Sequence, residues 1–167
     1  MRAWIVGLLA AALALPASAG VPEDIVAMIA GDYDNVKHRA SEVNAVSTVP
    51  GKHLVKAPPR YLMIRPVRLP NVAGATVYLE WHDTAKSGPV TTERIWAFSE
   101  TADGLVMNYY TLLPSGREKL KGLAEGAAGA AERAATVTMD DLFSYHERCN
   151  FAFARQGDGF RGELPKG

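Results

Sequence analysis

Two charged residues, Glu80 and Arg94, stand in neighbouring strand-like segments that are otherwise rich in aromatic and apolar residues. In "YLEWHDTAKSGPVTTERIWAF", residues 78–98, a Lys-Ser-Gly-Pro turn joins the two segments. An antiparallel hairpin centred on this turn would place Glu80 opposite Arg94 and Tyr78 opposite Trp96. Such a face suits a flat ligand with carboxylates, because a guanidinium can donate two parallel hydrogen bonds to a carboxylate and aromatic rings stack.

The face that holds Glu80 and Arg94 has two interpretations. His82 lies on the same face of the expected hairpin, and the following strand adds either Tyr109 or Tyr110. If this face meets solvent, Glu80 and Arg94 form a surface ion pair that contributes about 0–1 kcal/mol. If it lines a cavity, the same residues form a recognition site with aromatic walls. The opposite face is apolar enough to be the packed one: it carries Val77, Leu79, Trp81, Ile95 and Ala97.

The elements that position these residues are strands. After Pro58 the apolar pattern has a period of two, and four segments rich in β-branched and aromatic residues are separated by turn residues: "RYLMIRPVRL", "ATVYLEWH", "TTERIWAFSE" and "LVMNYYTLL". Two further strand-like segments, "CNFAFARQ" and "FRGEL", lie near the end of the chain. Several short strands at regular spacing predict an all-β, mainly antiparallel sandwich or barrel.

Two segments have helical features. "VPEDIVAMIAGDYDN" predicts a short N-terminal helix with Ile25, Met28 and Ile29 on one face and Gly31 at its end. Residues 116–136, "GREKLKGLAEGAAGAAERAAT", combine alanine, charge and several glycines, which weaken a helix. This second segment is expected to be helix, loop or both, and we place no function there.

The first 19 residues have the pattern of a cleavable export signal. Arg2 precedes an apolar run over residues 4–15, and "PASA" ends in an Ala-x-Ala cleavage pattern. The run is shorter than the ~20 apolar residues that span a bilayer. We therefore expect residues 1–19 to be removed and residues 20–167 to form one exported domain, periplasmic or secreted, with no membrane segment. The only cysteine, Cys149, would there be a buried thiol, a partner for another chain or half of a bridge.

The charge balance and the motifs exclude several classes of function. Eighteen Lys and Arg residues balance eighteen Asp and Glu residues, so no basic surface for nucleic acid is expected. "GDGFRG" at residues 157–162 fits G-x-G-x-x-G, but no helix follows, and we expect a turn. No nucleophile motif is present. The histidines show no paired ligand spacing, so we predict no metal site: they are His38, His53, His82 and His146.

Short motifs along most of the chain resemble those of the T-type chromophore lyase family (CpcT/CpeT), which attaches linear tetrapyrroles, the bilins, to cysteines of phycobiliproteins. They occur in the family's order and cover roughly residues 24–164. The matching stretches are "IAGDYDN" at 29–35, "IRP" at 64–66, "YLE" at 78–80, "ERI" at 93–95, "YYTLLP" at 109–114 and "MDDLFSYHERCNFAF" at 139–153.

The resemblance implies a calyx-like, lipocalin-like antiparallel β-barrel, often dimeric, that holds a bilin without a metal or organic cofactor. In such a lyase the thiolate of a partner cysteine adds to the vinylidene group of the bilin. Glu80 would then be the catalytic proton donor or the partner of a pyrrole nitrogen, and Arg94 would clamp a propionate. Tyr78, Trp96 and Tyr110 would surround the tetrapyrrole.

Some positions depart from the family pattern. Trp81 stands where the family has Gln, "TTER" replaces a Tyr-Arg-Gln-Arg run, and Arg148 replaces the Gly before the first conserved cysteine. A second, C-terminal cysteine has no counterpart here, which would make the chain a C-terminally truncated member.

Three functions stay open at this point. The first is a bilin lyase, with a phycobiliprotein as partner and a homodimer as its assembly. The second is an exported, non-catalytic carrier of a tetrapyrrole or another hydrophobic acid. The third is a structural interaction module in which side chains fill the Glu80 face and leave no cavity.

Overall fold

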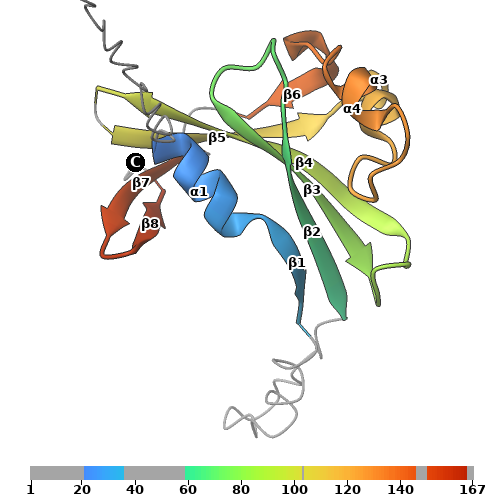
Figure 1. The fold of residues 1–167 in the computed structure, drawn as a ribbon, viewed down its shortest axis with the longest axis horizontal. Coiled ribbons are helices and arrows are strands. Elements are labelled where there is room, and N and C mark those ends of the chain that lie inside the picture. Colours follow the sequence, from blue (N-terminus) through green and yellow to red (C-terminus); the bar gives the residue numbers. More distant parts are fainter. Residues whose placement is uncertain (1–20, 36–58, 103, 146–149, 165–167) are drawn as a thin grey trace, which may run out of the picture.

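The computed structural model of the protein describes residues 21–35, 59–102, 104–145 and 150–164 (Figure 1). The expected signal segment at residues 1–19, Cys149 and three of the four histidines lie outside the described residues. No helix in the described ranges is long and apolar enough to cross a membrane.

The described residues form an eight-stranded antiparallel sheet. Seven strands follow each other in space in the order β1 (Gly31–Asp34), β2 (Arg60–Val67), β3 (Ala75–Asp83), β4 (Val90–Thr101), β5 (Gly104–Leu112), β7 (Phe151–Gln156) and β8 (Gly159–Glu163). The short β6 (Leu142–Ser144) pairs with the end of β5 that β7 leaves free. The sheet curls into a half-barrel (Figure 1), which confirms the predicted fold class, mainly antiparallel β with a calyx-like form.

Each face of the sheet is covered by its own helical element. Helix α1 (Val21–Ile29) packs on one face, here called the α1 face, through Ile25 and Val26 against residues such as Leu79 and Phe98. The other face, here called the α3–α4 face, is covered by the segment with α3 (Pro114–Leu120) and α4 (Ala130–Ala134). Both faces therefore carry a core, and the expectation that only the face of Leu79 is packed is wrong.

Helix α1 forms where the sequence predicts it, but it is rotated relative to the prediction. Ile25 and Val26 are its buried residues, whereas Met28 is 52% exposed. Only Ala30 separates the helix from β1, whose Gly31 is paired with Ile64 of β2. Because this connection is so short, the pairing of β1 fixes which side of the helix faces the sheet.

The segment over the α3–α4 face is part helix and part turn, as its composition predicts. Gly122, Gly126 and Gly129 all have positive φ, which separates α3 from α4 by turns. A one-turn 3-10 helix, Met139–Asp141, follows and leads into β6. The buried Asp141 carboxylate accepts hydrogen bonds from Lys119 Nζ at 2.6 Å and from the Thr138 amide at 2.8 Å, so it ties this helix to α3.

Asp141→Asn should lower the free energy of unfolding at neutral pH by about 1–3 kcal/mol, because it breaks this ion pair. The Lys119 ammonium and the Thr138 amide hold the pKa of Asp141 well below its usual range. The ionised Asp141 carboxylate therefore contributes its full share to the free energy of unfolding above the unfolded pKa of about 4. This share is lost as the pH falls through the folded pKa.

Urea unfolding at neutral pH and near pH 2 measures this contribution. The difference between the variant and the wild type should be clearly smaller near pH 2 than at neutral pH, and Asp140→Asn, an exposed neighbour, should behave as wild type at both values. An equal difference at both pH values would contradict the role given to Asp141.

Candidate functional site

The pairing of β3 with β4 differs from the prediction by one residue. Glu80 lies opposite Glu93, Leu79 opposite Arg94, and Val77 opposite Trp96. The register shifts between Trp81 and His82, because β4 carries an extra residue close to the turn. The predicted pairs of Glu80 with Arg94 and of Tyr78 with Trp96 are therefore wrong.

A shift of one residue moves side chains to the other face of a sheet. Tyr78 and Glu80 lie on the α3–α4 face, and Tyr110 joins them because it is paired with Ile95. Arg94 and Trp96 lie on the α1 face. The five residues expected to form one site are thus divided between two faces.

Glu80 is the centre of a buried polar network on the α3–α4 face. Its Oε1 accepts a hydrogen bond from the Tyr78 hydroxyl at 2.6 Å, and its Oε2 lies 3.0 Å from His82 Nε2. The same Tyr78 hydroxyl lies 2.8 Å from Glu93 Oε1. Glu80 and His82 are 3% and 2% exposed, so water does not solvate this network from its inner side.

The backbone fixes one nitrogen of the His82 ring as a donor. His82 Nδ1 lies 3.0 Å from the Gly88 carbonyl oxygen, which can only accept, so Nδ1 carries the hydrogen. In the neutral ring Nε2 is then an acceptor, and it faces a carboxylate oxygen that is an acceptor as well. The contact is favourable when a proton, carried by either atom, or a metal ion lies between the two atoms.

Burial sets the electrostatics of the network. Desolvation raises the pKa of Glu80, and the nearby Glu125 carboxylate raises it further, against the lowering effects of the Tyr78 hydrogen bond and of His82. Desolvation and the Glu80 carboxylate also raise the pKa of Tyr78, which keeps its hydroxyl protonated. Glu80 is therefore held where negative charge is unfavourable unless a cation compensates it.

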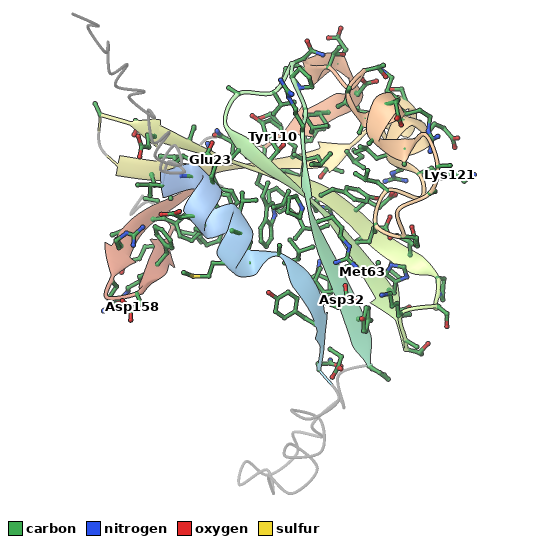
Figure 2. All side chains as sticks on the ribbon, in the orientation of Figure 1. Glu23, Asp32, Met63, Tyr110, Lys121 and Asp158 are labelled. Atoms are coloured by element: carbon green, nitrogen blue, oxygen red, sulfur yellow. The ribbon has the colours of Figure 1, made fainter. Side chains whose placement is uncertain are left out.

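A pocket of about 510 Å³ opens next to this network. Glu80, Val90 and Glu93 contribute its sheet side, and the α3–α4 segment contributes the rest: Arg117, Glu118, Lys121, Gly122 and Glu125. Figure 2 labels Lys121 on this segment and Tyr110 on the sheet. Four carboxylates face two cations here, and one of the cations, Arg117, lies 3.6 Å from Glu93.

Sequence reasoning missed Glu93 and Glu125. The motif "YLE" pointed to Glu80, but the assumed pairing put Arg94 in the position that Glu93 holds. Glu125 lies in the alanine- and glycine-rich segment to which no function was assigned, and it comes within 4.8 Å of the ligand atoms of Glu80 and His82. Only the tertiary packing of that segment on the sheet shows this proximity.

Arg94 lies on the α1 face among aromatic side chains. Its Nε donates to the Tyr109 hydroxyl at 2.5 Å, its Nη1 donates to the Glu93 carbonyl at 2.7 Å, and its guanidinium lies 5.6 Å from the centre of the Tyr109 ring. Within the described residues no carboxylate forms an ion pair with Arg94. This partly buried positive charge is therefore not neutralised by the described chain.

Trp96 follows Arg94 on the same face and has an unsatisfied donor. Its indole Nε1 is buried and has no hydrogen-bond partner in the described part of the chain. Tyr109, which is paired with Trp96, is followed by two further aromatic rings. The ring centroids of Tyr109 and Tyr145 are 5.4 Å apart, and those of Tyr145 and Phe143 are 5.3 Å apart. Tyr145 and Phe143 are 39% and 52% exposed. The α1 face thus carries a partly buried guanidinium, a buried indole N–H without a partner and exposed aromatic area on neighbouring strands.

The chain was compared with known proteins by family and by sequence. No protein-family model matches it, and no curated protein matches it.

Proposed function

We propose that the protein is an exported carrier that binds a flat hydrophobic acid on the α1 face, with a linear tetrapyrrole as the ligand class that the resemblance implies. One observation carries the proposal: the guanidinium of Arg94 has no carboxylate partner in the described chain, and Trp96, two residues further along the same strand face, has an unsatisfied Nε1. A ligand carboxylate is the group that would accept from such donors.

The energetics favour a ligand at this place. A buried N–H without an acceptor costs about 1–3 kcal/mol, and buried polar groups in proteins are rarely left in this state. The Tyr109 hydroxyl and the Glu93 carbonyl hold the guanidinium in one orientation, which reduces the entropy lost on binding. The rings of Tyr109 and Tyr145 add surface on which a conjugated ligand can stack.

Arg94→Ala should weaken the binding of phycocyanobilin by about tenfold or more, because a hydrogen bond to a charged group contributes about 1.5–3 kcal/mol. Bilin absorbance and the quenching of tryptophan fluorescence would follow the titration. Trp96→Phe, which keeps a ring and removes the N–H, should weaken binding to a smaller extent.

Arg117→Ala is the matched control, because it removes a guanidinium from the pocket on the opposite face. It should bind the bilin as the wild type does. If Arg117→Ala loses affinity and Arg94→Ala does not, the ligand lies in the Glu80 pocket and the assignment to the α1 face is wrong. If a fluorescent fatty acid binds with the same dependence on Arg94 and the bilin does not, the carrier takes an aliphatic acid.

Bilin lyase activity is a second proposal, and the position of Glu80 supports it. Glu80 lines a pocket and its pKa is raised by burial, so it could donate a proton to a ligand on the α3–α4 face. Such a reaction would use Glu80 without Arg94, since the two residues lie on opposite faces. Transfer of phycocyanobilin to a phycobiliprotein subunit tests it: Glu80→Gln should abolish transfer, and wild-type activity in this variant would remove the acid role.

A further inference from the structure

We infer that Glu80, His82 and Glu125 form a binding site for a divalent transition-metal ion on the α3–α4 face. The ligand atoms of these three residues all lie within 4.8 Å of one another. The inference does not rest on the proposed carrier function, because it concerns the other face of the sheet.

The orientation of His82 is that of a metal ligand. Its Nδ1–H donates to the Gly88 carbonyl, which directs the lone pair of Nε2 toward Glu80 Oε2 at 3.0 Å. Histidines that bind metals almost always donate their other ring N–H to a carbonyl or a carboxylate in this way. Both side chains are buried, so the two atoms face each other without bulk water between them.

Glu125 distinguishes a metal ion from a proton. A proton shared by Glu80 and His82 needs no third group, yet the carboxylate of Glu125 lies beside them and adds negative charge. Ligand atoms around a tetrahedral zinc ion are roughly 3.3–3.6 Å apart, given bonds of about 2.0–2.2 Å. The Glu80–His82 separation of 3.0 Å needs to widen only slightly, and the exposed Glu125 side chain can approach by changing its rotamer.

The surroundings support the same assignment. The Tyr78 hydroxyl donates to the other oxygen of Glu80 and so orients the carboxylate, as outer partners of metal ligands do. The pocket is lined by Glu80 and Glu125, which provides an entry path as far as these two carboxylates, and its four carboxylates against two cations attract a positive ion. One imidazole and two carboxylates suit Zn²⁺, Mn²⁺, Fe²⁺ or Co²⁺ better than Ca²⁺ or Mg²⁺, which take oxygen ligands only.

The test is a calorimetric titration of the metal-free full-length protein with Zn²⁺, repeated with Co²⁺ while visible absorption reports its coordination. We expect saturable binding of one ion per chain. Glu125→Gln should weaken binding by about tenfold or more. His82→Gln should abolish binding, and circular dichroism would report whether this variant remains folded.

Glu118→Gln provides the matched control, because Glu118 is exposed and lines the same pocket but is not one of the three ligands. It should bind zinc as the wild type does. No saturable binding by the wild type, or equal losses in Glu125→Gln and Glu118→Gln, would overturn the inference, since equal losses indicate only a diffuse negative potential. Arg94→Ala should leave zinc affinity unchanged, so this result and that of the bilin titration are independent.

Discussion

Replacing Glu80 by alanine is expected to lower the free energy of unfolding by about 3–5 kcal/mol, because the change breaks a buried charged network. It leaves His82 Nε2 without its partner and removes the shorter of the two contacts of the Tyr78 hydroxyl, which keeps only Glu93 Oε1 at 2.8 Å. Glutamine should have almost no such cost. Its carbonyl oxygen can accept from Tyr78, and its NH₂ group can donate to His82 Nε2, the acceptor that the carboxylate cannot satisfy without a cation.

Urea unfolding in the presence of a chelator measures both variants without interference from bound metal. The order wild type ≈ Glu80→Gln > Glu80→Ala is expected, and a small gain for glutamine would be consistent with the fixed ring protonation of His82. A glutamine variant as unstable as the alanine variant would show that Nε2 is a donor in the folded protein. The site would then hold an imidazolium paired with a carboxylate.

Gly88→Ala is expected to destabilise the fold by about 3 kcal/mol or more, because the new methyl group has no space. A Cβ at this position would lie 1.8 Å from the Asp83 carbonyl oxygen, which belongs to the backbone of the same turn. The turn could relieve this contact only by moving the peptide whose carbonyl accepts from His82 Nδ1. The substitution should therefore also disturb the orientation of His82.

Gly159→Ala is the control for this prediction, since its Cβ would meet nothing closer than 3.9 Å and its own backbone is not left-handed. It should change stability by no more than about 0.5 kcal/mol. Thermal or urea unfolding of the two variants measures this difference in stability. If Gly88→Ala were as mild as Gly159→Ala, the turn would be adaptable and the carbonyl of Gly88 would not be a fixed partner of His82.

The strands could be predicted from the sequence, but their register could not. The alternation of apolar residues located β2 to β5 within one or two residues, because burial of a face acts on every second residue along a strand. Pairing depends instead on the turn and on a register shift next to His82, and neither leaves a pattern in the apolar residues. Because both faces of this sheet are packed, the hydrophobic pattern could not reveal the error of one residue.

The candidate site was predictable in part. Glu80 attracts attention as a carboxylate in an apolar strand, and the structure places it in a buried network with Tyr78, which was also predicted. Glu125 could not be found in this way, since an exposed glutamate in an alanine-rich segment has no distinguishing sequence feature. Its role depends on how the α3–α4 segment packs over the sheet, with Leu120 and Ala124 buried in the core of that face.

The two faces share strand β4, and consecutive residues of that strand serve both of them. Glu93 directs its carboxylate toward Tyr78 on one face, while its carbonyl accepts from Arg94 on the other. A ligand that binds Arg94 therefore contacts a side chain that is hydrogen-bonded to the peptide unit of Glu93. By thermodynamic reciprocity, if the metal ion changes the affinity of the carrier ligand, the ligand changes the affinity of the metal ion by the same factor. Binding of the ligand on the α1 face and binding of the metal ion on the α3–α4 face would then be linked by a single coupling free energy.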